Sequence, residues 1–167
     1  MTYELKLERL IDAPPEIVFD TIVDPLAQPE IFADQVPGWD LWECEIDLRV
    51  GGVWTFVFGP ADRSGEADRS RSVFTEIDRP RRLAYRASMF VCGWGRTVDF
   101  TETITFEDRD GKTLVTVQQS DVETEADRDA FLDGTPGYLD ALERAVAARS
   151  PIAPRRGSEA GRGGSDR

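Results

Sequence analysis

The chain has 167 residues, a formal net charge of −12 and no histidine. A chain of this length can bury one core, whereas the absence of histidine excludes Ser-His-Asp and Cys-His nucleophile systems and the ordinary zinc, haem and non-haem iron sites. The negative charge repels phosphate, so we expect no nucleic-acid partner, and we also expect no metal and no cofactor.

The two cysteines and the two ends of the chain predict the cellular compartment of the protein and the extent of its domain. Cys44 and Cys92 have neither the spacing of a metal site nor that of a disulfide framework, which favours a reduced intracellular protein. The first residues do not resemble a signal peptide, and no apolar run is long enough to span a bilayer. We therefore expect a cytoplasmic protein without membrane insertion, with one domain over residues 1–149 and a disordered tail of Pro, Gly, Ser and Arg over residues 150–167.

The N-terminal segment reads as a strand followed by two short helices. Apolar and charged residues alternate over residues 3–11, which predicts a strand with one buried face. Asp12-Ala-Pro-Pro-Glu then begins a helix, because proline is tolerated in the first helical turn. After the break at Asp24-Pro25, a second short helix is predicted over residues 26–32.

The clearest alternation in the chain predicts a strand with one face to solvent. Its apolar residues are separated by charged ones and are Trp42, Cys44, Ile46, Leu48 and Val50. Gly51-Gly52 turns this strand into a hairpin, whose second strand carries Trp54, Phe56 and Phe58. A loop rich in Gly, Pro, Asp and Ser follows over residues 59–69.

The second half of the chain continues the sheet and ends in a helix. Strands are predicted over residues 70–78, 82–91, 97–107 and 113–122. Thr124 and Asp127 form a capping-box-like start to the last helix, whose apolar residues are Phe131, Tyr138, Leu142 and Val146. Pro136 should kink this helix or split it in two. The pattern predicts an α+β fold, a seven-stranded curved antiparallel sheet wrapped round a long C-terminal helix.

Four motifs stand in this order along the chain. They are Asp12-Ala-Pro-Pro-Glu-Ile-Val-Phe, Asp47-Leu-Arg-Val-Gly-Gly-Val-Trp, Glu76-Ile-Asp-Arg-Pro-Arg-Arg-Leu-Ala-Tyr and Gly137-Tyr138. With them the chain resembles the START-like SRPBCC superfamily, which has the helix-grip fold of birch-pollen allergens, and it is nearest the branch of heat-shock-protein ATPase activator homologues. The resemblance implies a cavity between sheet and helix. Members bind lipids, sterols or polyketides there, some cyclise polyketides, some sequester reactive natural products, and some contact chaperones.

The alternation also indicates which side chains would face such a cavity. The residues on the concave face would be Trp42, Cys44, Ile46, Trp54, Phe56, Phe58, Tyr85, Met89 and Phe100, with Tyr138 and Leu142 facing them from the helix. Taken singly, each of them is better explained as ordinary core, although a set this rich in aromatic residues favours a pocket. Trp94, between two glycines, is a candidate for covering the mouth of the cavity or a plain edge aromatic.

Glu102 is the candidate residue for polar ligand recognition or acid catalysis. It is in phase with Phe100 and Ile104, so its carboxylate lies on the apolar side unless a bulge shifts the register. There it would have to be protonated, paired with an arginine or wetted by the cavity, and each of these would suit polar ligand recognition or acid catalysis. The alternative is that a register change exposes it.

These observations favour a protein that binds a hydrophobic or aromatic small molecule, as a carrier or for sequestration or self-resistance. One alternative is an enzyme like the polyketide cyclases and aromatases, in which Glu102 or Tyr85 moves protons. A second is a partner-binding module of the chaperone ATPase-activator type. The residues leave open whether any reaction is catalysed, with binding alone favoured, and whether a chaperone or a second copy is contacted.

Overall fold

The computed structural model of the chain describes residues 1–33 and 35–150, so the predicted tail from residue 151 onward lies outside the described residues. The elements in chain order are β1 (Tyr3–Ile11), α1 (Pro15–Ile22), α2 (Gln28–Phe32), β2 (Trp39–Ile46), β3 (Val53–Pro60), β4 (Asp68–Asp78), β5 (Arg82–Val91), β6 (Arg96–Arg109), β7 (Lys112–Val122) and α3 (Glu125–Arg149).

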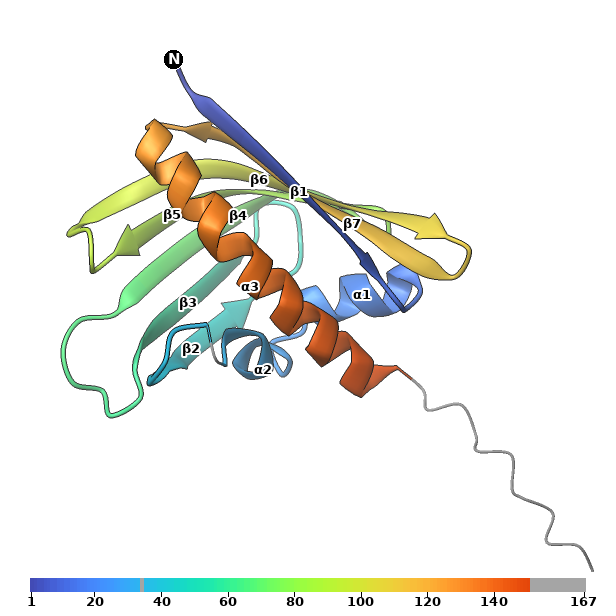
Figure 1. The fold of residues 1–167 in the computed structure, drawn as a ribbon, viewed down its shortest axis with the longest axis horizontal. Coiled ribbons are helices and arrows are strands. Elements are labelled where there is room, and N and C mark those ends of the chain that lie inside the picture. Colours follow the sequence, from blue (N-terminus) through green and yellow to red (C-terminus); the bar gives the residue numbers. More distant parts are fainter. Residues whose placement is uncertain (34, 151–167) are drawn as a thin grey trace, which may run out of the picture.

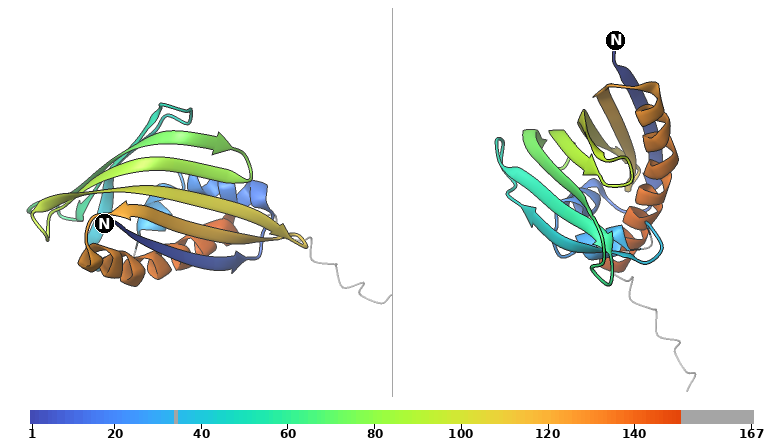
Figure 2. Two further views of the ribbon diagram at one scale, coloured as in Figure 1. Left: turned by 90° about the horizontal axis from the view of Figure 1, so that it is seen from above. Right: turned by 90° about the vertical axis from the view of Figure 1, so that its left-hand side faces the viewer.

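The strands form one antiparallel sheet in the order β1-β7-β6-β5-β4-β3-β2. The sheet is strongly curved, and α3 runs across its concave side, with α1 and α2 at one end (Figures 1 and 2). The α+β helix-grip fold predicted from the sequence is thereby confirmed. No helix in the described ranges is both long and apolar enough to cross a bilayer.

The last helix begins where the sequence predicted and is not split. Thr124 is the N-cap, and its side-chain oxygen accepts a hydrogen bond from the backbone N–H of Asp127 at 3.1 Å. Pro136 lies inside a single helix from Glu125 to Arg149, so the expected division in two is wrong. Proline removes the backbone donor that would bond to the Leu132 carbonyl, and the turns beyond Pro136 stay helical because their buried residues pack into the core.

The predicted strand over residues 42–50 is the main departure in the sheet. The observed β2 ends at Ile46, and its pairing with β3 shifts register at Trp42. The backbone beyond Ile46 forms a turn that bonds to β4 instead, because the N–H of Gly51 donates to the Phe74 carbonyl at 2.8 Å. Leu48 and Val50, expected on the buried face, are therefore 41% and 63% exposed.

The core fills one half of the concave side. From α1, Val18, Phe19 and Ile22 are fully buried, and Phe19 packs edge-on against Phe106 with ring centroids 5.2 Å apart. The C-terminal half of α3 contributes further buried residues, Leu139, Ala141, Leu142, Ala145 and Val146. In its N-terminal half Phe131 and Thr135 are only half-buried. The C-terminal half of the helix closes the core, whereas the N-terminal half covers a part of the sheet that it does not fill.

Candidate functional site

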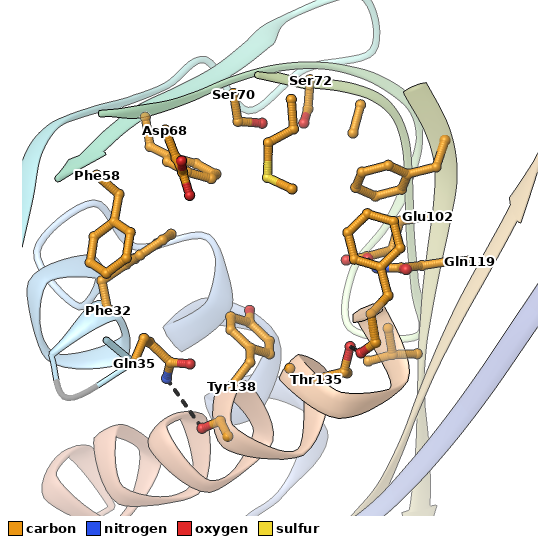
Figure 3. Close-up of a pocket in the computed structure, with 18 of the residues that line it drawn as sticks. Phe32, Gln35, Phe58, Asp68, Ser70, Ser72, Glu102, Gln119, Thr135 and Tyr138 are labelled. Atoms are coloured by element: carbon orange, nitrogen blue, oxygen red, sulfur yellow. Dashed lines mark hydrogen bonds between the residues drawn. The ribbon is translucent and has the colours of Figure 1, made fainter. Parts of the chain in front are cut away.

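A cavity of about 820 Å³ lies between the concave face of the sheet, α2 and the N-terminal half of α3 (Figure 3). Its volume is within the range of small-molecule sites. The lining residues are Phe32, Gln35, Val36, Trp54, Phe56, Phe58, Asp68, Ser70, Ser72, Tyr85, Ala87, Met89, Phe100, Glu102, Val117, Gln119, Ala130, Phe131, Asp133, Gly134, Thr135, Gly137, Tyr138, Asp140 and Arg144.

The structure brings most of the sequence-predicted site residues to this cavity. Those on its wall are Trp54, Phe56, Phe58, Tyr85, Met89, Phe100, Glu102 and Tyr138. Their contact with a ligand stays a prediction. Cys44 and Ile46 instead pack against the hydrophobic core from β2, and Leu142 is fully buried in that core. Burial raises the pKa of the Cys44 thiol, which is expected of a residue that packs rather than reacts.

Two predicted tryptophans lie away from the cavity wall. The indole nitrogen of Trp42 donates to the Pro60 carbonyl at 3.0 Å, and the bulge at Trp42 takes its ring out of the alternation. Trp94, in the turn between β5 and β6, is 41% exposed and lies beneath the Arg96 guanidinium at 5.3 Å. Neither side chain lines the cavity, so the expectation that Trp94 covers its mouth finds no support in the geometry.

Aromatic rings from three strands and two helices make up most of the apolar wall. Phe32 of α2 packs against Phe56 and Phe58 of β3, with centroids 4.8 and 5.3 Å away. On the other side, Phe100 of β6 meets Phe131 of α3 at 4.9 Å. These pairs join the helices to the sheet across the cavity, so a flat or bulky apolar guest would meet ring surface on both sides.

The polar part of the wall is a cluster on three neighbouring strands, Tyr85, Glu102 and Gln119. Cross-strand pairing sets Glu102 directly opposite both partners. The Tyr85 hydroxyl donates to Oε1 of Glu102, and Nε2 of Gln119 donates to Oε2 at 2.5 Å. Glu102 is 8% exposed and takes part in no ion pair among the described residues. Of the three states expected for a buried carboxylate, pairing with an arginine is thus the one that the geometry does not provide.

Burial controls the protonation of this cluster. It raises the pKa of Glu102, and the hydrogen bonds from Tyr85 and Gln119 offset this only in part. Burial, together with the charge of Glu102, also raises the pKa of Tyr85 and of Tyr138 well above the ordinary value for tyrosine. Both phenols therefore keep their protons and can donate hydrogen bonds, while burial favours the protonated form of Glu102 more than water does.

Some polar lining residues were not among the predicted ones. Gln119 was not a candidate from the sequence, although counting outward from the Asp110-Gly111 turn places it opposite Glu102. Ser70 and Ser72 of β4 are 8% and 5% exposed and point into the cavity (Figure 3). The same alternation that selected Tyr85 on the next strand could have found them, but serines carry no apolar signal.

The described residues contain no group of three or more His, Cys, Asp or Glu side chains placed to hold a metal ion. The chemical character of the cavity wall is given by the side chains that line it. It combines a large aromatic wall with a single buried carboxylate held between neutral donors. Such an arrangement suits the binding and orientation of a mostly apolar molecule with a polar end.

Residues 12–147 match the family described as activator of Hsp90 ATPase homolog 1-like protein. Among solved structures, a protein from Rhizobium leguminosarum is 28% identical, with a TM-score of 0.71 over 89% of this chain and 96% of that one. The AHSA1-like protein from Aeromonas hydrophila is 26% identical, with a TM-score of 0.67 over 88% and 94%. A protein from Rhizobium loti, 21% identical with a TM-score of 0.72 over 87% and 97%, shares the fold. No curated protein matches the chain.

Proposed function

Because the chain belongs to the family of activator of Hsp90 ATPase homolog 1-like proteins, we propose that it uses the cavity of its helix-grip fold to bind a hydrophobic or aromatic small molecule. The observation that carries this proposal is the unfilled space of about 820 Å³ under the N-terminal half of α3, whose apolar wall consists mainly of aromatic side chains. A protein core is normally packed without such space. The fold is less stable with an empty apolar cavity of this size than it would be with the cavity filled.

The size of the cavity supports useful affinity without any reaction. A guest that loses roughly 300 Å² of apolar surface gains about 7 kcal/mol at about 25 cal/mol per Å². This figure alone corresponds to a dissociation constant of roughly 10 μM, and the cost of immobilising the guest makes the affinity weaker than that. The polar cluster of Tyr85, Glu102 and Gln119 would then orient the guest rather than supply most of the binding energy.

Binding is tested by native mass spectrometry of the full chain with a panel of hydrophobic metabolites. We expect a one-to-one adduct that is weakened by Phe100→Ala and by Tyr138→Ala, since both side chains line the cavity. Phe90→Ala is the matched control, because Phe90 lies next to Met89 on β5 but is not a lining residue. An adduct that all three variants weaken equally, or no adduct with any compound, would contradict the proposal.

A second candidate is proton transfer on a bound polyketide-like substrate. The Tyr85–Glu102 hydrogen bond and the raised pKa of Glu102 favour it, since a rise in the pKa of a carboxyl brings it closer to the working pH, where an acid or base is most effective. Product analysis with polyketide substrates would show turnover that Glu102→Gln abolishes. Turnover that survives the substitution would remove Glu102 from any catalytic role.

A further inference from the structure

The charged groups at the cavity are mostly negative. Asp68, Glu102, Asp133 and Asp140 line it, against the single guanidinium of Arg144. Asp140 is neutralised by Arg9, whose guanidinium lies 2.6 Å from it, and Asp68 accepts a hydrogen bond from a backbone N–H. Asp133 and Arg144 are exposed, whereas Glu102 lies inside. The field within the cavity therefore attracts a cation and repels a carboxylate or phosphate head group.

Glu102 also has unused capacity for hydrogen bonds. An ionised carboxylate has about four acceptor positions, and each oxygen of Glu102 accepts one hydrogen bond, from Tyr85 or from Gln119. Both donors are neutral, and a buried carboxylate without a cation is expensive. A guest that brings its own positive charge would supply the partner that the described residues do not.

The rings around Glu102 would favour the same guest. Trp54 lies against Tyr85 at a centroid distance of 5.6 Å, and Tyr138 is near enough to Glu102 for the carboxylate charge to affect it. Ring faces attract cations, most strongly when the cation is removed from water. The cation–π contacts within the described residues involve Trp42, Trp94 and Tyr3, none of which lines the cavity. The arginines in these three cation–π contacts therefore do not contact the aromatic rings that line the cavity.

From this arrangement we propose that the ligand is a hydrophobic amine, with an apolar or aromatic body in the cavity and an ammonium group that donates to Glu102. The inference rests on the proposed function and narrows it, because it selects organic cations over fatty acids and other anionic amphiphiles. Tyr138 and Trp54 would contact the part of the guest next to its charge, and Phe32, Phe56 and Phe58 would contact the far end of its body.

The test compares three fluorescent ligands that share one ring system and differ in the head group, 1-pyrenylmethylammonium, 1-pyrenylmethanol and 1-pyrenecarboxylate. Fluorescence anisotropy of each is measured with the full chain at physiological ionic strength, so that surface attraction to the acidic protein is screened. We expect the amine to bind roughly ten- to a hundredfold more tightly than the alcohol, which is what a hydrogen bond to a charged group contributes. The carboxylate should bind most weakly.

The variant Glu102→Gln should remove most of the preference for the amine over the alcohol. Glu45→Gln is the control, because it takes the same charge from the exposed face of β2 and should keep the preference. If the ligands bind but the carboxylate is favoured, or if Glu102→Gln leaves the preference intact, the amine inference is overturned while the binding function stands. If none of the three binds, the binding proposal fails and the inference fails with it.

Discussion

Replacing Glu102 with glutamine should stabilise the fold at neutral pH and have little effect in acid. The carboxylate is 8% exposed, and its hydrogen-bond donors are the neutral side chains of Tyr85 and Gln119. Burial raises its pKa, with a smaller opposing effect from the two hydrogen bonds. Glu102 therefore ionises at a higher pH in the folded chain than in the unfolded chain.

The sign of the effect follows from proton binding. Between the unfolded pKa of about 4.3 and the higher folded pKa, the folded state binds more protons than the unfolded state, so stability falls as pH rises. Above the folded pKa the loss is constant, at about 1.4 kcal/mol for each pKa unit between the two states. Glutamine does not ionise and avoids this loss. Its amide oxygen can still accept from Nε2 of Gln119, and its amide nitrogen can pair with the Tyr85 hydroxyl oxygen, so a hydrogen bond to each partner is kept.

Urea unfolding, followed by tryptophan fluorescence from about pH 4 to about pH 8, measures the difference in unfolding free energy between Glu102→Gln and the wild type. We expect it to rise with pH to a plateau of about 1–2 kcal/mol in favour of the variant. Glu45→Gln, on the exposed face of β2, should show no such rise. A variant that is less stable than the wild type at neutral pH would refute the reasoning, because it would mean that the folded protein favours the charged form of Glu102.

Three further predictions concern the frame of the site, and urea unfolding measures each of them. Phe74→Ala removes a phenyl ring from a residue that is 1% exposed and should lower the free energy of unfolding by about 3–5 kcal/mol. Val50→Ala, at a residue that is 63% exposed, should change it by less than about 0.5 kcal/mol. Gly52→Ala places a methyl group against the Asp47 carbonyl and should cost about 1–3 kcal/mol, while Gly93→Ala meets open space and should be near neutral. Thr124→Ala removes the N-cap of α3 and should cost about 1 kcal/mol; equal stability with and without the hydroxyl would show that the cap contributes nothing.

The order of the elements along the chain and most element boundaries were predictable because they depend on local patterns. The bounds of β1 and β5 are those predicted, since alternation over nine and ten residues leaves little room for error. β2 was displaced because the backbone after Ile46 bonds to Phe74, which is far along the chain. No local pattern could show that contact, and without it Leu48 and Val50 look like continuations of the strand.

The site was predictable where it follows alternation and not where it follows cross-strand geometry. Tyr85, Phe100 and Glu102 reach the cavity because a strand residue faces the same side as its second neighbour. Gln119 reaches it because the register of a two-residue turn sets it opposite Glu102. Trp42 misses it because a bulge interrupts the alternation at that residue.

The sequence by itself determined which faces of the strands and of the last helix are apolar, the order of the elements, and that Glu102 is in phase with apolar neighbours on its strand. Only the tertiary structure decided where those faces touch. Along α3, Leu139 and Leu142 meet the core and are buried, whereas Phe131 and Tyr138 stand across an open space from the sheet. Periodicity gives the direction of a side chain, but the distance between two apolar surfaces depends on the curvature of the sheet and the path of the helix across it, which only the assembled fold sets.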